Sequence, residues 1–132
     1  MASIFSKIIK GEIPSYKIAE DEKHYAFLDI NPAAKGHTLC IPKREVDYLF
    51  DLKPSELADL TRFSQEVAIA IDKALKPIRT GVIVEGMEVP HAHIHLIPIY
   101  KESQAFSLGK KVDVSADEMT KLSKQIQQHL SL

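Results

Sequence analysis

The sequence has few of the features that mark a secreted, membrane or disulfide-stabilised protein. Its one cysteine, Cys40, excludes an intramolecular disulfide and favours a reducing compartment. The longest apolar run, from Val67 to Ile71, is far too short to cross a bilayer, and the first residues lack the apolar core of a signal peptide. We therefore expect a cytoplasmic protein with no membrane partner.

An excess of charge of either sign is also missing. The 17 basic and 18 acidic residues leave a net charge of −1, and no strongly basic run occurs. Because nucleic-acid binding needs a clustered positive surface, we expect no nucleic-acid partner, whereas a small anionic ligand would need only local donors. The length and the 45% hydrophobic content suit one globular domain, residues 1–132, around one core.

What the sequence does have is an unusual run of histidines. In the segment His91-Ala92-His93-Ile94-His95-Leu96-Ile97, three histidines alternate with apolar residues. Strict alternation predicts a strand, so the three imidazoles should share one face, with neighbours about 7 Å apart. Packing alone is a poor explanation for this pattern. The spacing leaves two chemistries open, a metal site or metal-free acid, base or nucleophilic chemistry.

The rest of the chain predicts an α+β domain. Pro54 suits the first turn of a long central helix that ends at about Lys76, and its apolar residues follow helical spacing. Ser115 and Glu118 have capping-box spacing and predict a C-terminal helix. A five-stranded antiparallel sheet is indicated by segments in mostly hairpin order, at residues 16–19, 24–29, 37–41, 81–85 and 91–97.

The central helix has more apolar surface than one core-facing stripe requires. Phe63, Ile69 and Ala70 widen the stripe. A homodimer that covers the extra surface is one explanation, and deep burial within the domain is the other. Outside the triad, His24 and His129 are interpreted as surface residues without a role.

At this point the sequence resembles the histidine-triad (HIT) family, in its small Hint-like branch. The segment His91–Ile97 matches the family pattern of three histidines alternating with apolar residues. Three further stretches occur in the expected order, namely residues 4–9 with Ile13-Pro14, residues 26–30 and residues 36–42. The resemblance implies a HIT-like fold.

The resemblance also implies a reaction at the α-phosphate of a purine nucleotide. Substrates would be nucleoside phosphoramidates, dinucleoside polyphosphates or related nucleotides, and a covalent histidine–nucleotidyl intermediate would then be hydrolysed by water. His93 takes the place of the family nucleophile. His91 and His95 flank it, orienting the ring and contacting phosphate, and His37 supports the triad. This chemistry needs no cofactor, since a neutral imidazole whose other nitrogen donates to an acceptor is itself a nucleophile.

The family's substrate-binding positions can be carried over to this chain. Asp29 corresponds to the residue that holds the ribose hydroxyls, and a carboxylate suits that task because it accepts two hydroxyl donors. Ile30 follows it. The apolar pocket that sandwiches the base corresponds to Phe5, Ile8, Ile13 and Phe27. Each of these apolar residues can also be explained as ordinary core.

Two stretches depart from the family pattern. Ser3 and Ser6 stand where relatives have zinc-binding cysteines, and Glu45 stands where many have histidine, so we expect no structural zinc. The loop Gly86–Pro90 lacks the serine and glutamine that many relatives use to hold phosphate and leaving group. Glu88 would repel phosphate if it pointed inward. The departures leave the leaving-group preference open.

Two other functions remain as alternatives. A metal-dependent hydrolase could use the same imidazoles, and loss of activity with EDTA, restored by zinc, would indicate it. A nucleotide-binding or scaffolding module could keep the pocket without catalysis, and tight AMP binding without turnover would indicate that.

Overall fold

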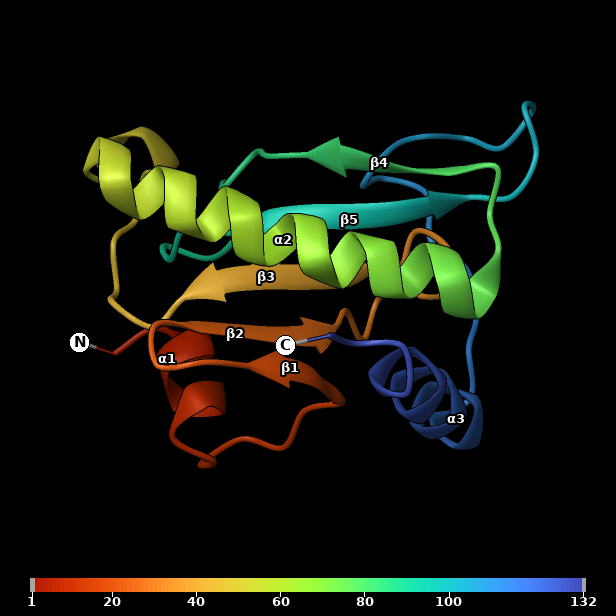
Figure 1. The fold of residues 1–132 in the computed structure, drawn as a ribbon, viewed down its shortest axis with the longest axis horizontal. Coiled ribbons are helices and arrows are strands. Elements are labelled where there is room, and N and C mark those ends of the chain that lie inside the picture. Colours follow the sequence, from red (N-terminus) through yellow and green to blue (C-terminus); the bar gives the residue numbers. More distant parts are fainter. Residues whose placement is uncertain (1, 132) are drawn as a thin grey trace.

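The computed structural model describes residues 2–131 as one antiparallel sheet with helices on both faces (Figure 1). The strand order is β1-β2-β3-β5-β4, which confirms the predicted five-stranded α+β fold. No helix within residues 2–131 is long and apolar enough to span a membrane. The elements, in chain order, are α1 (Ile4–Ile9), β1 (Lys17–Glu20), β2 (His24–Leu28), β3 (Thr38–Pro42), the 3-10 helix η1 (Leu49–Asp51), α2 (Pro54–Leu75), β4 (Arg79–Ile83), β5 (Ile94–Ile99) and α3 (Ala116–Gln127).

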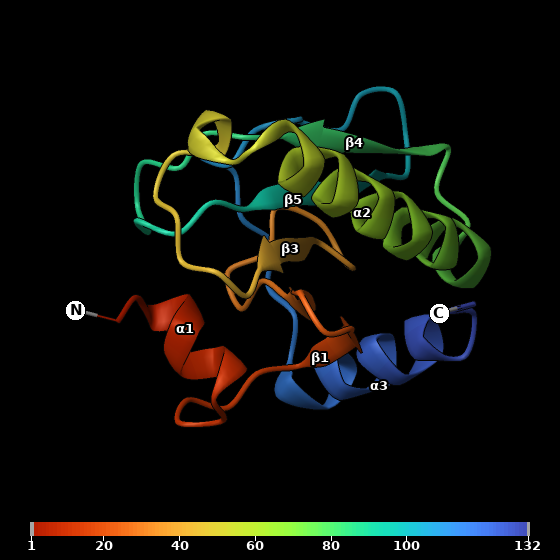
Figure 2. The same ribbon diagram turned by 60° about the vertical axis from the view of Figure 1, so that its left-hand side comes forward.

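The two faces of the sheet carry separate cores. Neighbouring side chains on a strand point to opposite faces, so β2 sends Ala26 and Leu28 under α2 and α3. Its alternate residues, Tyr25 and Phe27, pack instead against Phe5 of α1. Figure 2 shows α1 and α2 on opposite sides of the strands. This division decides which residues can meet the histidine segment.

The helix ends follow the local signals in the sequence. The Ser3 hydroxyl accepts a hydrogen bond from the Ser6 amide at the start of α1, and Gly11 has the left-handed φ of +80° just after it. Pro54 begins α2, and the Ser115 hydroxyl accepts from the Glu118 amide at α3. The predicted long helix and C-terminal helix are therefore confirmed.

Two strands differ from the predicted ranges by two residues or more, and the other three differ by one residue at one or both ends. β4 lies at Arg79–Ile83, and β5 begins at Ile94 rather than at His91. The segment before Ile94 makes its hydrogen bonds outside the ladder: the Ala92 amide donates to the Val46 carbonyl at 2.6 Å. The expectation of one regular strand from His91 is wrong for that reason.

Candidate active site

The histidine motif lies where the chain enters β5, on the face of the sheet that α1 covers. His91 and His93 precede the strand, yet all three rings keep to one side. The Phe5 ring lies 5.8 Å from the ring of His91 and 5.1 Å from that of His93. The His93 and His95 rings are 4.8 Å apart. The predicted clustering of the triad is therefore present without a regular strand.

Within residues 2–131, one ring nitrogen of His93 is hydrogen-bonded and no hydrogen bond reaches the other. Nδ1 lies 2.7 Å from the backbone carbonyl oxygen of His91. A carbonyl only accepts hydrogen bonds, so Nδ1 carries a proton, and in the neutral ring Nε2 then holds the lone pair. His93 also lines a cavity of about 260 Å³. This is the tautomer that a nucleophilic imidazole requires.

A backbone amide fixes the tautomers of His37 and His95. The Ala33 amide donates to Nδ1 of His37 at 2.9 Å, so His37 carries its proton on Nε2. That N–H donates to Nδ1 of His95, also at 2.9 Å. His95 is therefore left with a proton on Nε2. This row of hydrogen bonds, from the Ala33 amide through His37 to His95, therefore ends in the Nε2–H group of His95, whose ring lies beside that of His93.

Burial keeps these two imidazoles neutral. It lowers the pKa of His37 to about 4 and that of His95 to about 3. Positive charge nearby, at Lys111 among other groups, lowers both pKa values further. Both residues are therefore uncharged near pH 7. The neutral state agrees with the hydrogen bonds, because Nδ1 of each ring accepts one and must carry no proton.

His91 supports the site from behind and does not line the cavity. It is fully buried, its Nε2 donates to the Pro42 carbonyl at 2.7 Å, and its Nδ1 accepts from the Ser3 hydroxyl at 2.8 Å. Burial lowers its pKa. Because protein groups occupy both ring nitrogens, the side chain is not placed to contact phosphate as expected. Its contribution is the carbonyl that orients His93.

Within residues 2–131, Asp29, His37 and His95 form one group with the composition of a metal site. One ligand atom from each lies within 4.8 Å of the others. The hydrogen bond from the Ala33 amide opposes metal binding, because it keeps the proton of His37 on Nε2, the nitrogen that would face the ion. Nor is there an ion pair here: Asp29 Oδ2 lies 3.6 Å from this nitrogen, and His37 is neutral. The arrangement favours metal-free chemistry.

Three of the six expected substrate-binding residues, Phe5, Asp29 and Ile30, line the cavity. Burial raises the pKa of Asp29, while the Asn31 amide, which donates to its carboxylate at 2.8 Å, opposes that change. The carboxylate therefore lies at the cavity, and the ribose-binding role that the resemblance implied stays a prediction.

The other three, Ile8, Ile13 and Phe27, lie outside the cavity lining. They pack beneath Phe5 in the core of this face, where the ring of Phe27 meets that of Phe5 edge-on at 5.4 Å. They support the apolar wall without forming its surface. That surface is made instead by Ile4, Leu39 and Val89 together with Phe5.

Lys111 lines the cavity and was missed in the sequence. Its charge opposes the rise that burial causes in the pKa of Asp29 and adds to the fall that burial causes in the pKa values of His37 and His95, so a cation lies near all three groups. Lysine is a common partner of phosphate. No local pattern marked this residue, because it follows β5 in an irregular segment.

Long-range packing brings Lys111 to the site. The Phe106 ring occupies the space that a side chain at Gly81 would need, so the segment lies directly on β4. The Val112 amide donates to the Pro32 carbonyl at 2.9 Å, which joins the segment to the loop after Asp29. The position of Lys111 therefore depends on glycine in one strand and on a backbone hydrogen bond to a distant loop.

Hydrogen bonds connect the residues at the positions where the family resemblance suggested zinc ligands. Glu45 accepts from the Ser3 amide at 2.7 Å and from the Ser6 hydroxyl at 2.6 Å, and these bonds lower its pKa to about 2. The Ser3 hydroxyl also donates to His91. We call Ser3, Ser6, Glu45 and His91 the N-terminal clasp. Because Ser3, Ser6 and Glu45 offer neither a thiolate nor an imidazole, the side chains of the clasp do not suit structural zinc.

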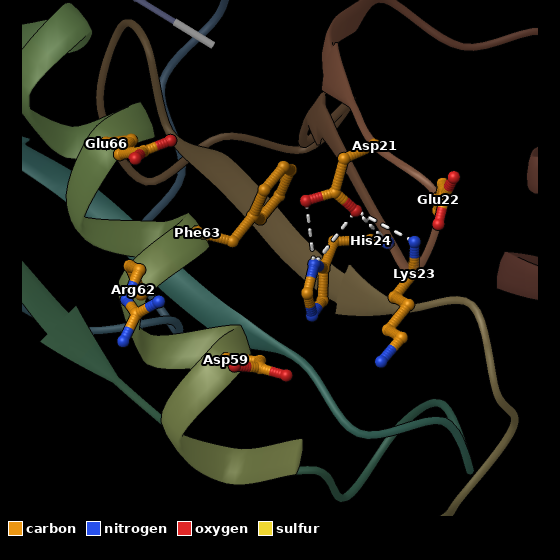
Figure 3. Close-up of a pocket in the computed structure, with 8 residues that line it drawn as sticks. All are labelled: Asp21, Glu22, Lys23, His24, Asp59, Arg62, Phe63 and Glu66. Atoms are coloured by element: carbon orange, nitrogen blue, oxygen red, sulfur yellow. Dashed lines mark hydrogen bonds and ion pairs between the residues drawn. The ribbon is translucent and has the colours of Figure 1, made fainter. Parts of the chain in front are cut away.

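A larger cavity of about 340 Å³ lies on the opposite face, between α2 and the β1–β2 turn (Figure 3). His24, predicted to be a surface residue, is buried here, because its ring stacks on Phe63 at 5.0 Å and its Nδ1 lies 3.0 Å from both carboxylate oxygens of Asp21. Six of the eight lining residues are charged, and Phe63 is turned to His24. Phe63 is therefore the one large apolar side chain among the described residues that line this cavity.

Together, the fold and the cavity of about 260 Å³ define an α+β protein in which a histidine, His93, faces a site with apolar walls, a carboxylate and a lysine. The family model for the HIT domain matches residues 10–102. This chain belongs to the HIT family.

Similarity to individual proteins extends over nearly the whole chain. The adenosine 5'-monophosphoramidase HNT1 of Saccharomyces cerevisiae is 38% identical over 131 residues, which cover 95% of this chain and 80% of that protein. Among solved structures, a HIT-like protein of Bartonella henselae involved in cell-cycle regulation has a TM-score of 0.86 at 32% identity, covering 97% and 96% of the two chains. A zinc-bound histidine triad protein of Mycobacterium smegmatis has a TM-score of 0.81 at 28% identity, covering 97% and 95%.

Proposed function

We propose that this protein is a phosphoramidase-type nucleotide hydrolase or nucleotidyl transferase that acts at the α-phosphate of purine nucleotides. The observation that carries the proposal is the state of His93, whose bound Nδ1 leaves the Nε2 lone pair free at the cavity. Membership of the HIT family and the similarity to a protein named as an adenosine 5'-monophosphoramidase support the substrate class.

The first step is an attack of His93 Nε2 on the phosphorus. A nitrogen–phosphorus bond forms, the bond from phosphorus to the leaving group breaks, and a leaving amine takes a proton from water. The modified imidazole is positively charged, and the hydrogen bond from its Nδ1 to the His91 carbonyl stabilises that charge. The N–H of His95 and the ammonium of Lys111 are the donors for the phosphoryl oxygens.

Water completes the reaction in the second step. It attacks the phosphorus of the intermediate and releases a proton to solvent, the bond to His93 breaks, and AMP leaves. The imidazole returns to its neutral form with the proton still on Nδ1. During both steps Asp29 holds the ribose hydroxyls, and the apolar wall formed by Phe5, Leu39 and Val89 holds the base.

Rapid-quench mass spectrometry with an adenosine phosphoramidate tests the proposal. We expect a transient mass increase of one adenylyl group on the peptide that contains residues 91–97. Turnover without this adduct would contradict the covalent mechanism. Tight AMP binding without turnover would indicate a binding module, and loss of activity with EDTA that zinc restores would indicate a metal enzyme.

We also propose that the protein is a cytoplasmic homodimer. The outer edge of β4 is unpaired within residues 2–131, and Ile78, Val82 and Val84 beside it are exposed. Ile69 on α2 is exposed as well. Unpaired edges and exposed apolar residues favour association. Analytical ultracentrifugation should give the mass of two chains, and a sedimentation coefficient of a monomer at high concentration would contradict this.

A further inference from the structure

The peptide unit between His91 and Ala92 is hydrogen-bonded at both of its polar groups. Its carbonyl oxygen lies 2.7 Å from Nδ1 of His93, and its N–H donates to the Val46 carbonyl at 2.6 Å. Because a trans peptide unit is planar, its C=O and N–H groups point in opposite directions. The orientation of the carbonyl that holds His93 therefore depends on where the Val46 carbonyl lies.

The same segment, residues 42–46, also binds the ring of His91. Nε2 of His91 donates to the Pro42 carbonyl at 2.7 Å. Both His91 and Ala92 are buried, so a hydrogen bond that is lost here is not replaced by one to water. Hydrogen bonds in series polarise one another, so the bond between Ala92 and Val46 also makes the His91 carbonyl a better acceptor. Residues 42–46 therefore fix the histidine that precedes the nucleophile at its ring and at its backbone.

Two side chains connect residues 42–46 to the helices on either side of the sheet. Arg44 donates twice to the carboxylate of Glu56 in α2, each time at 2.6 Å. Glu45 accepts hydrogen bonds from the two serines of the N-terminal clasp, at 2.7 Å and 2.6 Å. Since α1 and α2 lie on opposite sides of the strands (Figure 2), the segment is held from both sides. The position of the Val46 carbonyl depends on these contacts, because the chain is irregular here.

Of these two side chains, Glu45 also reaches His91 by a second route. The Ser3 hydroxyl accepts from the Ser6 amide at 3.0 Å and donates to Nδ1 of His91 at 2.8 Å. Glu45 binds both serines and so fixes the turn that carries this hydroxyl. The ion pair of Arg44 is an exposed one, and such pairs contribute little. Glu45 is therefore the side chain that acts on both the ring and the backbone of His91.

We propose that Glu45 is a positioning residue for the nucleophile. It does not line the cavity. It holds the Val46 carbonyl and the Ser3 hydroxyl in place, and these two groups fix the peptide unit that orients His93. The inference rests on the proposed function and adds to it a residue outside the cavity. Misorientation of the imidazole impairs the attack on phosphorus more than the binding of base and ribose, so kcat should respond more than affinity.

Two replacements of Glu45 and one matched control test the positioning role. Glu45→Ala removes both acceptor bonds, and we expect it to lower kcat for an adenosine phosphoramidate by about fivefold and AMP affinity by less than about twofold. Glu45→Gln should stay within about twofold of the unaltered protein in both quantities, because a side-chain amide oxygen also accepts hydrogen bonds. Asp47→Ala removes an exposed carboxylate that lies outside the clasp, and it should change kcat by less than about twofold.

Amide hydrogen exchange, followed by NMR, gives a measurement that does not depend on turnover. In Glu45→Ala the Ala92 amide should exchange about fivefold faster, because the carbonyl that accepts its hydrogen bond is held less firmly. The Ala26 amide belongs to a buried residue of β2 in the core on the α2 face, and its rate should stay within about twofold. A general loss of stability would accelerate both amides alike, so the ratio of the two rates isolates the local effect.

The outcomes separate this inference from the proposed function. An unchanged exchange rate at Ala92 in Glu45→Ala, equal acceleration of both amides, or a loss of kcat in Glu45→Gln as large as in Glu45→Ala would overturn the positioning role and leave the hydrolase assignment intact. Failure of the unaltered protein to cleave any phosphoramidate would overturn the proposed function. Faster exchange confined to Ala92 would in that case still support the effect of Glu45 on the peptide unit beside His93.

Discussion

The two faces of the sheet each bury an imidazole beside a cavity, and the pair makes a direct comparison. His93 on the α1 face and His24 on the α2 face are 5% and 7% exposed, and each has its Nδ1 hydrogen-bonded. The partner of His93 is a neutral carbonyl, whereas that of His24 is the carboxylate of Asp21. Local geometry alone does not separate the two sites.

The surroundings do separate them. His93 has a second imidazole at 4.8 Å that presents an N–H, and its cavity has an apolar wall and a lysine. His24 is stacked on Phe63 in a larger cavity lined mostly by charged residues. Cavity size therefore does not single out the candidate active site here. What distinguishes the α1 face is a set of hydrogen bonds that fixes which nitrogen is free.

Replacing each imidazole gives the largest expected contrast. His93→Ala should lower kcat for an adenosine phosphoramidate by about 10⁴-fold, on the order of 5 kcal/mol, because no other group can form the intermediate. AMP affinity, measured by titration calorimetry, should change by less than about threefold because the base and ribose contacts remain. His24→Gln is the matched replacement on the other face and should leave kcat within about twofold. Equal losses in both variants would remove the distinction.

Acid should weaken the α1 face through its neutral histidines. The pKa values of His37 and His95 are lowered to about 4 and about 3, so below pH 6.5 the unfolded chain binds protons that the folded chain does not. The free energy of unfolding should therefore fall as the pH decreases from 7.5 to 5, by about 4 kcal/mol in total for the two histidines. Urea titrations at several pH values measure this, and His37→Asn should reduce the slope. A flat profile would contradict the neutral pair.

Replacing Lys111 removes a positive charge from the cavity that contains His93. Lys111→Ala should lower kcat/KM by about 20-fold, or roughly 2 kcal/mol, through loss of the phosphate contact. Its neighbour Lys110 is exposed and does not line the cavity, so Lys110→Ala is the matched control and should change kcat/KM by less than about twofold. If both variants behave alike, Lys111 acts only through the general field of the protein.

Substitutions in the N-terminal clasp should have the smallest effects of the set. Ser3→Ala leaves Nδ1 of the buried His91 without its donor and should lower the free energy of unfolding by about 1 kcal/mol, with a few-fold loss of kcat through His93. Ser6→Ala removes an exposed hydrogen bond to Glu45 and should cost less than about 0.5 kcal/mol. Chemical denaturation and steady-state kinetics measure both. A larger effect from Ser6 would show that the clasp does not act through His91.

Local patterns predicted much of the fold. Helical spacing after Pro54, the cap at Ser115 and the alternating strands gave the α+β sheet and its two main helices, because these signals depend on near neighbours in sequence. The start of β5 was missed, since the Ala92 amide bonds to a distant carbonyl. The burial of His24 was missed because the residue that covers it, Phe63 of α2, is distant from it in the sequence.

By itself the sequence determined the fold class and drew attention to the three histidines at positions 91, 93 and 95, because both follow from residue types and short-range spacing. The choice of His93 among them came from the family resemblance. Only the tertiary structure decided which nitrogen of His93 is free, that Phe27 lies beneath the cavity wall, and that Lys111 joins the site. Those facts depend on hydrogen bonds and contacts between residues distant in sequence. The free energy of such contacts depends on positions in space, and a linear pattern does not contain them.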